Sequence, residues 1–302
     1  MATGASGYHR GVTSQTSLAS TFVNRGGLTL SYRVQGAGPI MVCHPGGPGF
    51  SAHYLQDIGG IDQARTLVLL NPRGTAESSR PANPAAYDLD DYVNDLEDLR
   101  LHLGLESLDL LGQSHGGVVA MDYAARFPRR VKNLLLVTTL ARFAGAPKEA
   151  MDAAMATRAG EPWYADAIAA VEQEQAGKFR TDAEMGALWE REIYLYFARV
   201  GDTERAYMES IRGEKVNADA LRFFNTEVFE KFDLRDELRR ITARTLVVVG
   251  EDDFITGPVA GAEIVAGIPK ADLVTIKDAG HFVFVEQRQA FRDAVLRWLE
   301  SS

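Results

Sequence analysis

Several features common in other protein classes are scarce or missing in this 302-residue chain. It has a single cysteine, Cys43, which excludes an internal disulfide and fits a reducing compartment. No run reaches the roughly 18 consecutive apolar residues of a membrane span. Residues 1–20 are rich in Gly, Ala, Ser and Thr and lack the apolar segment of a secretion signal. We therefore expect a flexible N-terminal tail over residues 1–20 and a cytoplasmic protein.

Positive charge is also in deficit. The 32 basic residues face 41 acidic ones, a formal charge of −9, which disfavours nucleic acid or an anionic membrane as a partner. The six histidines have no zinc-site spacing, and no glycine-rich nucleotide-binding motif follows a strand. We expect no metal, no cofactor, a small-molecule or short-peptide substrate, and a monomer or small homo-oligomer.

The chain alternates short apolar runs with helical patterns in two separated stretches. Strands joined by single helices indicate parallel pairing, so the sequence predicts an α/β fold with a mostly parallel sheet flanked by helices. From about residue 141 to 234 the alternation gives way to helical patterns alone, in which Trp189, Ile193 and Phe197 recur every four residues as on one helix face. We expect a core of residues 21–140 and 235–302, with residues 141–234 as a helical cap over the carboxyl ends of the strands.

The most informative motif is Gly112-Gln113-Ser114-His115-Gly116, between an apolar run and a helical pattern. Glycines on both sides of the serine permit the sharp turn that presents a hydroxyl at the carboxyl edge of a sheet. Serine alone is a weak nucleophile, so the motif requires a base and an orienting acid elsewhere.

Asp253 and His281 each follow a later strand pattern, in the order Ser114, Asp253, His281 that nucleophile-elbow hydrolases use. His281 would accept the serine proton, and Asp253 would fix the imidazole tautomer. Asp252 competes with Asp253 for this role. Taken singly, either aspartate could cap the next helix, and a lone histidine is usually a hydrogen-bonded structural residue.

The run from His44 to Gly49 follows another strand and contains three glycines. We assign the oxyanion donors to the backbone N–H groups of Gly47 and His115. A tight Gly/Pro turn without a catalytic role explains the run equally well.

These motifs together resemble the α/β-hydrolase superfamily, and within it the proline iminopeptidase-like branch. The resemblance is carried by Gly46-Gly47-Pro48-Gly49, Asn71-Pro72-Arg73-Gly74, Gly112-Gln113-Ser114-His115-Gly116-Gly117, Gly250-Glu251-Asp252-Asp253 and Gly280-His281. It implies an α/β-hydrolase fold with the helical cap inserted after the sixth strand, and it selects Asp253 over Asp252. The chain departs from the branch pattern at three positions: His115 replaces Trp, Asn71 replaces Asp, and Pro45 is inserted before the glycines.

The resemblance also implies that glutamates of the cap hold the free amine of a peptide substrate. Trp189-Glu190 resembles one such element, Glu227 is a candidate for a second glutamate, and Gly46 and Phe282 complete the candidate substrate-binding residues. A solvated helix face explains Glu190 equally well.

The sequence therefore predicts a serine hydrolase that cleaves an ester, lactone or amide through an acyl-enzyme on Ser114, with aminopeptidase activity of the proline iminopeptidase type as one form. The alternatives are a noncatalytic relative that binds a small molecule, and a carbon–carbon bond hydrolase or acyltransferase on the same scaffold.

Overall fold

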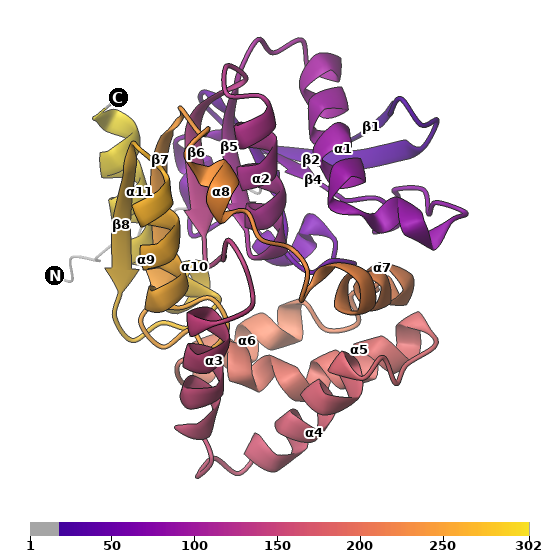
Figure 1. The fold of residues 1–302 in the computed structure, drawn as a ribbon, viewed down its shortest axis with the longest axis vertical. Coiled ribbons are helices and arrows are strands. Elements are labelled where there is room, and N and C mark those ends of the chain that lie inside the picture. Colours follow the sequence, from indigo (N-terminus) through magenta and orange to yellow (C-terminus); the bar gives the residue numbers. More distant parts are fainter. Residues whose placement is uncertain (1–17, 302) are drawn as a thin grey trace, which may run out of the picture.

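One eight-stranded sheet forms the centre of the protein in a computed structural model, which describes residues 18–301 (Figure 1). The strand order is β1-β2-β4-β3-β5-β6-β7-β8. Strands β1 and β2 pair antiparallel, as do β2 and β4, and all other pairs are parallel. The strands are β1 (Leu18–Val23), β2 (Thr29–Gly36), β3 (Ile40–His44), β4 (Thr66–Leu70), β5 (Leu108–Gln113), β6 (Val131–Val137), β7 (Arg244–Gly250) and β8 (Ala271–Ile276).

Helices cover both faces of the sheet, because successive residues of each central strand point to opposite sides. Leu110 and Leu134 pack on the side of α1 (Leu89–His102), α2 (His115–Arg126) and α9 (Pro258–Gly267). Leu111 and Leu135 pack on the side of α11 (Arg288–Glu300). Burial on both faces explains why the central strands read as continuous apolar runs.

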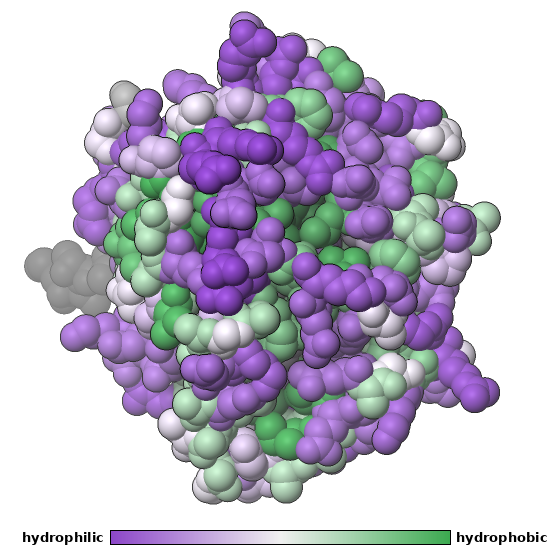
Figure 2. Space-filling view, in the orientation of Figure 1, coloured by the Kyte–Doolittle hydropathy of each residue, from purple (hydrophilic) through white to green (hydrophobic). Residues whose placement is uncertain are grey.

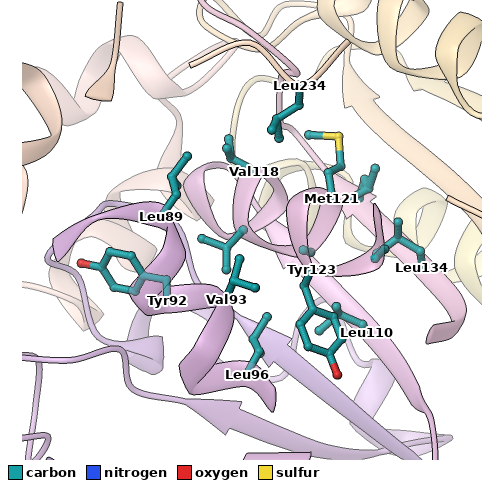
Figure 3. Close-up of a cluster of buried hydrophobic side chains, with 14 of the residues drawn as sticks. Leu89, Tyr92, Val93, Leu96, Leu110, Val118, Met121, Tyr123, Leu134 and Leu234 are labelled. Carbon is teal, nitrogen blue, oxygen red and sulfur yellow. The ribbon is translucent and has the colours of Figure 1, made fainter. Parts of the chain in front are cut away.

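The interface between the sheet and helices α1 and α2 is a dense apolar layer (Figure 3). Val93 and Leu96 of α1 face Val118 and Met121 of α2, and Leu110 lies beneath them in the sheet. Helix α1 begins at the N-cap Asp88, whose carboxylate accepts the Leu89 N–H. This packing fixes α2, the helix that starts directly after Ser114.

A group of helices lies between β6 and β7 along the chain and covers one end of the sheet (Figure 1). It comprises α3 (Ala146–Ala156), α4 (Tyr164–Gln175), α5 (Asp182–Glu192), a 3₁₀ turn (Ile193–Tyr196), α6 (Asp202–Ser210), α7 (Ala218–Phe223) and a π-helical turn (Phe224–Val228). The short helix α8 (Arg235–Leu238) comes next and packs against α2 and α9 beside the sheet. Part of it has a small apolar core of its own, which includes Phe179, Met185 and Leu188. The predicted fold class, a mostly parallel sheet with a helical cap after the sixth strand, is confirmed. The exact division into domains stays a prediction.

The expected N-terminal tail of residues 1–20 differs from the structure at its last three residues, which belong to a strand. Residues 1–17 lie outside the described residues, but Leu18–Val23 form β1, which pairs with β2 along its whole length. Phe22 is buried in the core on the α1 side and anchors this strand to the rest of the protein.

Within residues 18–301, none of the helices combines the length and apolar character needed to cross a bilayer. The surface in the view of Figure 2 is mostly hydrophilic, and apolar residues reach it only in small separate groups. The cytoplasmic location stays a prediction.

Candidate active site

Ser114 stands in the turn between β5 and α2, in a backbone conformation that side chains rarely adopt (φ 54°, ψ −124°). Its neighbours leave no space for side chains: a Cβ on Gly112 would lie 2.3 Å from the Gly116 carbonyl oxygen, and one on Gly116 would lie 2.3 Å from the His44 carbonyl oxygen. The strain is on the order of 1–3 kcal/mol and is held in place by packing and by the Ser114 N–H bond to the Val137 carbonyl (3.0 Å). The glycines of the motif are therefore steric requirements of this turn.

Asp253 and His281 meet beyond the ends of the two strands β7 and β8. The His281 Nδ1 and Asp253 Oδ2 atoms are 2.9 Å apart, and both residues are buried. The other carboxylate oxygen, Oδ1, accepts the N–H groups of Ile255 and Thr256. Of the two candidate aspartates, Asp253 is the one that meets His281, and Asp252 is exposed.

The electrostatics of this pair favour an ionised acid. Burial acts to raise the pKa of Asp253, but the neighbouring His281, the Thr256 hydroxyl and the Ile255 N–H together hold it below its ordinary value. An ionised carboxylate on Nδ1 fixes the imidazole tautomer that leaves Nε2 free to accept a proton.

Ser114 and His281 line the same cavity. No hydrogen bond joins the serine hydroxyl to His281 in residues 18–301; in ligand-free enzymes such bonds are often long and tighten when substrate binds. The parallel register explains why the two residues share an edge, since Gln113 pairs with Val137, Val137 with Val248, and Gly250 with Ile276.

The two expected oxyanion donors also line this cavity. Gly47 adopts φ 113°, and its backbone N–H and that of His115 have no hydrogen-bond acceptor anywhere in the described chain. His115 is the first residue of α2, where backbone N–H groups point outward and favour negative charge.

A buried chain of hydrogen bonds connects the oxyanion loop to the histidine loop. The Gly46 N–H donates to the Tyr54 hydroxyl, which donates to Gln113 Oε1, both at 2.5 Å. Gln113 Nε2 donates to Thr138 Oγ1 (2.9 Å), which donates to the His281 carbonyl (3.1 Å). Gly46 itself passes so close to Ser114 that a Cβ there would lie 2.7 Å from the serine Cβ. The side chains of Tyr54, Gln113 and Thr138 thus link the loop of Gly46, the turn of Ser114 and the loop of His281.

The family model of the alpha/beta hydrolase fold matches residues 39–287. The chain belongs to the alpha/beta hydrolase fold family.

Individual relatives agree with this assignment. The proline iminopeptidase of Levilactobacillus brevis is 26% identical over 274 residues, which cover 86% of this chain and 88% of that protein. A hydrolase from Pseudomonas aeruginosa PA01 superimposes with a TM-score of 0.70 at 26% identity, covering 93% of this chain and 98% of that one. The proline iminopeptidase of Mycobacterium smegmatis gives a TM-score of 0.72 at 22% identity, over 94% and 98% of the two chains. The expected resemblance to the proline iminopeptidase branch is confirmed.

Two departures from the branch pattern now have a structural account. The His115 ring packs edge-on against Tyr92 and Phe224, and burial first and the nearby His44 second hold its pKa well below the ordinary value, so the ring is neutral. Asn71 accepts the Ala52 N–H at Oδ1 and donates to the Ser31 hydroxyl from Nδ2, a combination that an ionised aspartate could not make.

The cavity above Ser114 has a volume of about 140 Å³ and a mainly aromatic and aliphatic lining. Trp189 and Phe282, two of the expected substrate-binding residues, are in its wall, and Trp189 packs against Phe50 at 4.8 Å between ring centroids. Gly46 is not part of the wall and acts through its close approach to Ser114.

The structure places the two expected amine-binding glutamates, Glu190 and Glu227, outside the cavity. Glu190 is exposed on α5 and does not line the cavity, and Glu227 lies outside it in an exposed ion pair with Lys231. Three other glutamates, Glu174, Glu192 and Glu214, line the cavity instead. Glu214 accepts the Ser51 hydroxyl and faces His53, which leaves Glu174 and Glu192 as a pair.

Glu192 is the unusual member of this pair. It is fully buried, and apart from an interaction with the carboxyl group of Glu174, neither of its oxygens has a hydrogen-bond partner in the described part of the chain. Burial, followed by the negative charge of Glu174, raises its pKa well above the ordinary value. A cationic donor on a ligand would favour the ionised form of this buried carboxyl group and supply the hydrogen-bond partner that its oxygens lack.

Proposed function

We propose that this alpha/beta hydrolase is a serine hydrolase that forms an acyl-enzyme on Ser114. The observation that carries the proposal is the buried bond between Asp253 and His281 at the wall of the cavity that Ser114 lines. His281 Nε2 takes the serine proton as the hydroxyl oxygen attacks the substrate carbonyl. The N–H groups of Gly47 and His115 stabilise the resulting oxyanion. His281 then gives the proton to the leaving group, and water releases the acyl group by the same steps.

We further propose that the preferred substrate carries a cationic amine next to the scissile carbonyl, as in the removal of an N-terminal residue from a short peptide. The unsatisfied carboxylate of Glu192 supports this, with Glu174 beside it in the same cavity. Tyr196 lies between this pair of glutamates and the proposed base. Its ring centroid is 5.3 Å from that of His281, and the charge of Glu192 adds to the effect of burial in raising the pKa of Tyr196. An ammonium group would satisfy the glutamates close to the reacting carbonyl.

A fluorophosphonate probe tests the first part. We expect one covalent adduct on Ser114, which the Ser114→Ala variant lacks while keeping its circular dichroism spectrum. Tight reversible ligand binding without any adduct would instead favour the noncatalytic relative.

Paired substrates test the second part. Prolyl naphthylamide should be cleaved much faster than its N-acetylated form, and Glu192→Gln should lower kcat/KM for the free amine by roughly 10- to 100-fold, the value of a hydrogen bond to a charged group. Hydrolysis of p-nitrophenyl acetate should change less than about twofold, since this ester has no amine. The matched control is Glu190→Gln, two residues away and exposed. Equal cleavage of the free and acetylated substrates would exclude amine recognition and favour an ester or lactone substrate for the apolar cavity.

A further inference from the structure

Glu286, the last residue of α10 (Val283–Glu286), joins two segments that are far apart in the sequence. Its Oε1 accepts the N–H of Ala198 from the cap, and its Oε2 accepts the N–H of Gly280, the residue before His281; both distances are 2.7 Å. One carboxylate thus holds the cap and the histidine loop at the same time.

The backbones of these segments are also in direct contact. The His281 N–H donates to the Tyr196 carbonyl at 2.7 Å. A Cβ on Gly280 would lie 2.5 Å from that carbonyl oxygen and 2.8 Å from the Ala198 nitrogen, so the loop can approach the cap this closely only with glycine at this position. The catalytic histidine is therefore positioned by the cap as well as by the sheet.

We propose that Glu286 is a positioning residue that couples the docking of the cap to the orientation of His281. The inference rests on the proposed function, in which His281 is the base. The ionised carboxylate accepts both backbone N–H groups. When it is protonated, one oxygen becomes a donor that faces an N–H, and one of the two bonds is lost.

The surroundings of Glu286 set the pH at which this change occurs. The charged and titratable groups that face it are Glu204 of α6, Asp253 and His281 of the catalytic pair, and Arg158, which follows α3. Burial raises the pKa of Glu286 to about 7, the two N–H bonds oppose this shift, and the negative charges of Glu204 and Asp253 add to it. The link between cap and histidine loop is thus complete above neutral pH and weakened below it.

The test compares kcat of the wild type and Glu286→Gln with p-nitrophenyl acetate from pH 5 to pH 8. The glutamine amide can accept only one of the two N–H groups at any pH. We expect kcat of the variant to be about tenfold lower at pH 8, less than the roughly hundredfold that a 1 Å displacement of a catalytic group can cost. The ratio should approach one at pH 5, because the protonated wild type then has the same defect.

A ratio that is the same at every pH would overturn the inference, because general loss of packing does not depend on the ionisation of this group. The matched control, Glu300→Gln at the exposed end of α11, should keep a ratio near one throughout. Unlike Glu286→Gln, Glu286→Asp retains the charge, so we expect its kcat to be lower than that of the wild type by the same factor at every pH. If the ratio for Glu286→Asp instead rose toward one at pH 5 as it does for Glu286→Gln, the charge would not be the property that matters and the proposal would be contradicted.

Fluorophosphonate labelling separates failure of the inference from failure of the function. If Ser114 of the wild type is labelled but the kcat ratio does not vary with pH, the role of Glu286 is wrong and the serine hydrolase remains. If Ser114 is not labelled, both proposals fall.

Discussion

The buried hydroxyl of Tyr54 provides a sharp test of how the site is held together. Tyr54→Phe removes one oxygen atom and keeps the ring, whose edge-on contacts with Phe50 and Phe282 are apolar. The loss leaves the Gly46 N–H and Gln113 Oε1 without the partner that each has in the wild type.

The expected cost follows from these two orphaned groups. A buried polar group that loses its partner costs about 1–3 kcal/mol, so the loss of two partners should lower the free energy of unfolding by about 2–6 kcal/mol. The rate should fall as well, because Gly46 precedes the oxyanion donor Gly47. Complete loss of an oxyanion donor costs roughly 100- to 1,000-fold in kcat, and we expect about tenfold for a donor that is displaced but present.

Guanidinium unfolding followed by tryptophan fluorescence measures the stability, and p-nitrophenyl acetate hydrolysis measures the rate. Tyr164→Phe is the control, since the Tyr164 hydroxyl has no hydrogen-bond partner within residues 18–301. In a double-mutant cycle, Gln113→Leu combined with Tyr54→Phe should cost less than the sum of the two single changes, because they remove a shared bond. A Tyr54→Phe protein within about 0.5 kcal/mol of the wild type and equally active would refute the reasoning.

Three further outcomes follow from groups described by the structure. Asp95→Ala removes the buried ion-pair partner of the buried Arg73, so chemical denaturation should show that the free energy of unfolding falls by about 3–5 kcal/mol. The control is Asp98→Ala, whose partner Arg25 is half exposed, and it should cost less than about 1 kcal/mol. The pKa of Glu286 is raised from 4.5 to about 7 on folding, so its contribution to stability is complete below pH 4.5 and is lost as the pH rises through 7. The free energy of unfolding of the wild type should therefore fall by up to about 3 kcal/mol over this range, and Glu286→Gln should abolish that fall. Identical curves of stability against pH for the two proteins would contradict this. Gly112→Ala should yield little folded protein by circular dichroism, because its Cβ meets backbone at 2.3 Å, whereas Gly160→Ala, with no atom within 4 Å, should resemble the wild type.

The fold was accessible from the sequence because its signals are local. Apolar runs buried on both faces, helices that fit between them, and glycines that permit one sharp turn each appear within a few consecutive residues. The order of Ser114, Asp253 and His281 then placed three chemical groups at one sheet edge, since parallel strands bring their carboxyl ends together.

The cap was harder to predict from the sequence because its helices are short and end where the spacing of apolar residues continues. The four-residue spacing of Trp189, Ile193 and Phe197 predicted one continuous helix face, but α5 ends at Glu192 and a 3₁₀ turn follows. On α5 itself, Glu192 lines the cavity and Glu190 is exposed. Spacing alone carries no information about which of two glutamates on one turn points inward, because that depends on packing against distant segments.

The N-terminal strand and the role of Glu286 depend on contacts over long sequence separations. Strand β1 has a weak pattern of its own and is stabilised by pairing with β2. Glu286 looks like an ordinary acidic residue near a helix start until Ala198 and Gly280 are brought to its two oxygens.

The helical cap divides the chain so that Ser114 comes before it and Asp253 and His281 come after it. A proteolytic cut within the cap would therefore place the proposed nucleophile and its two proposed partners on different fragments. The fragments would still be joined edge to edge by β6 and β7, whose register pairs Asn133 with Arg244 through to Val137 with Val248. Two fragments of this protein, divided within the cap and expressed separately, should therefore reassemble through the pairing of β6 with β7.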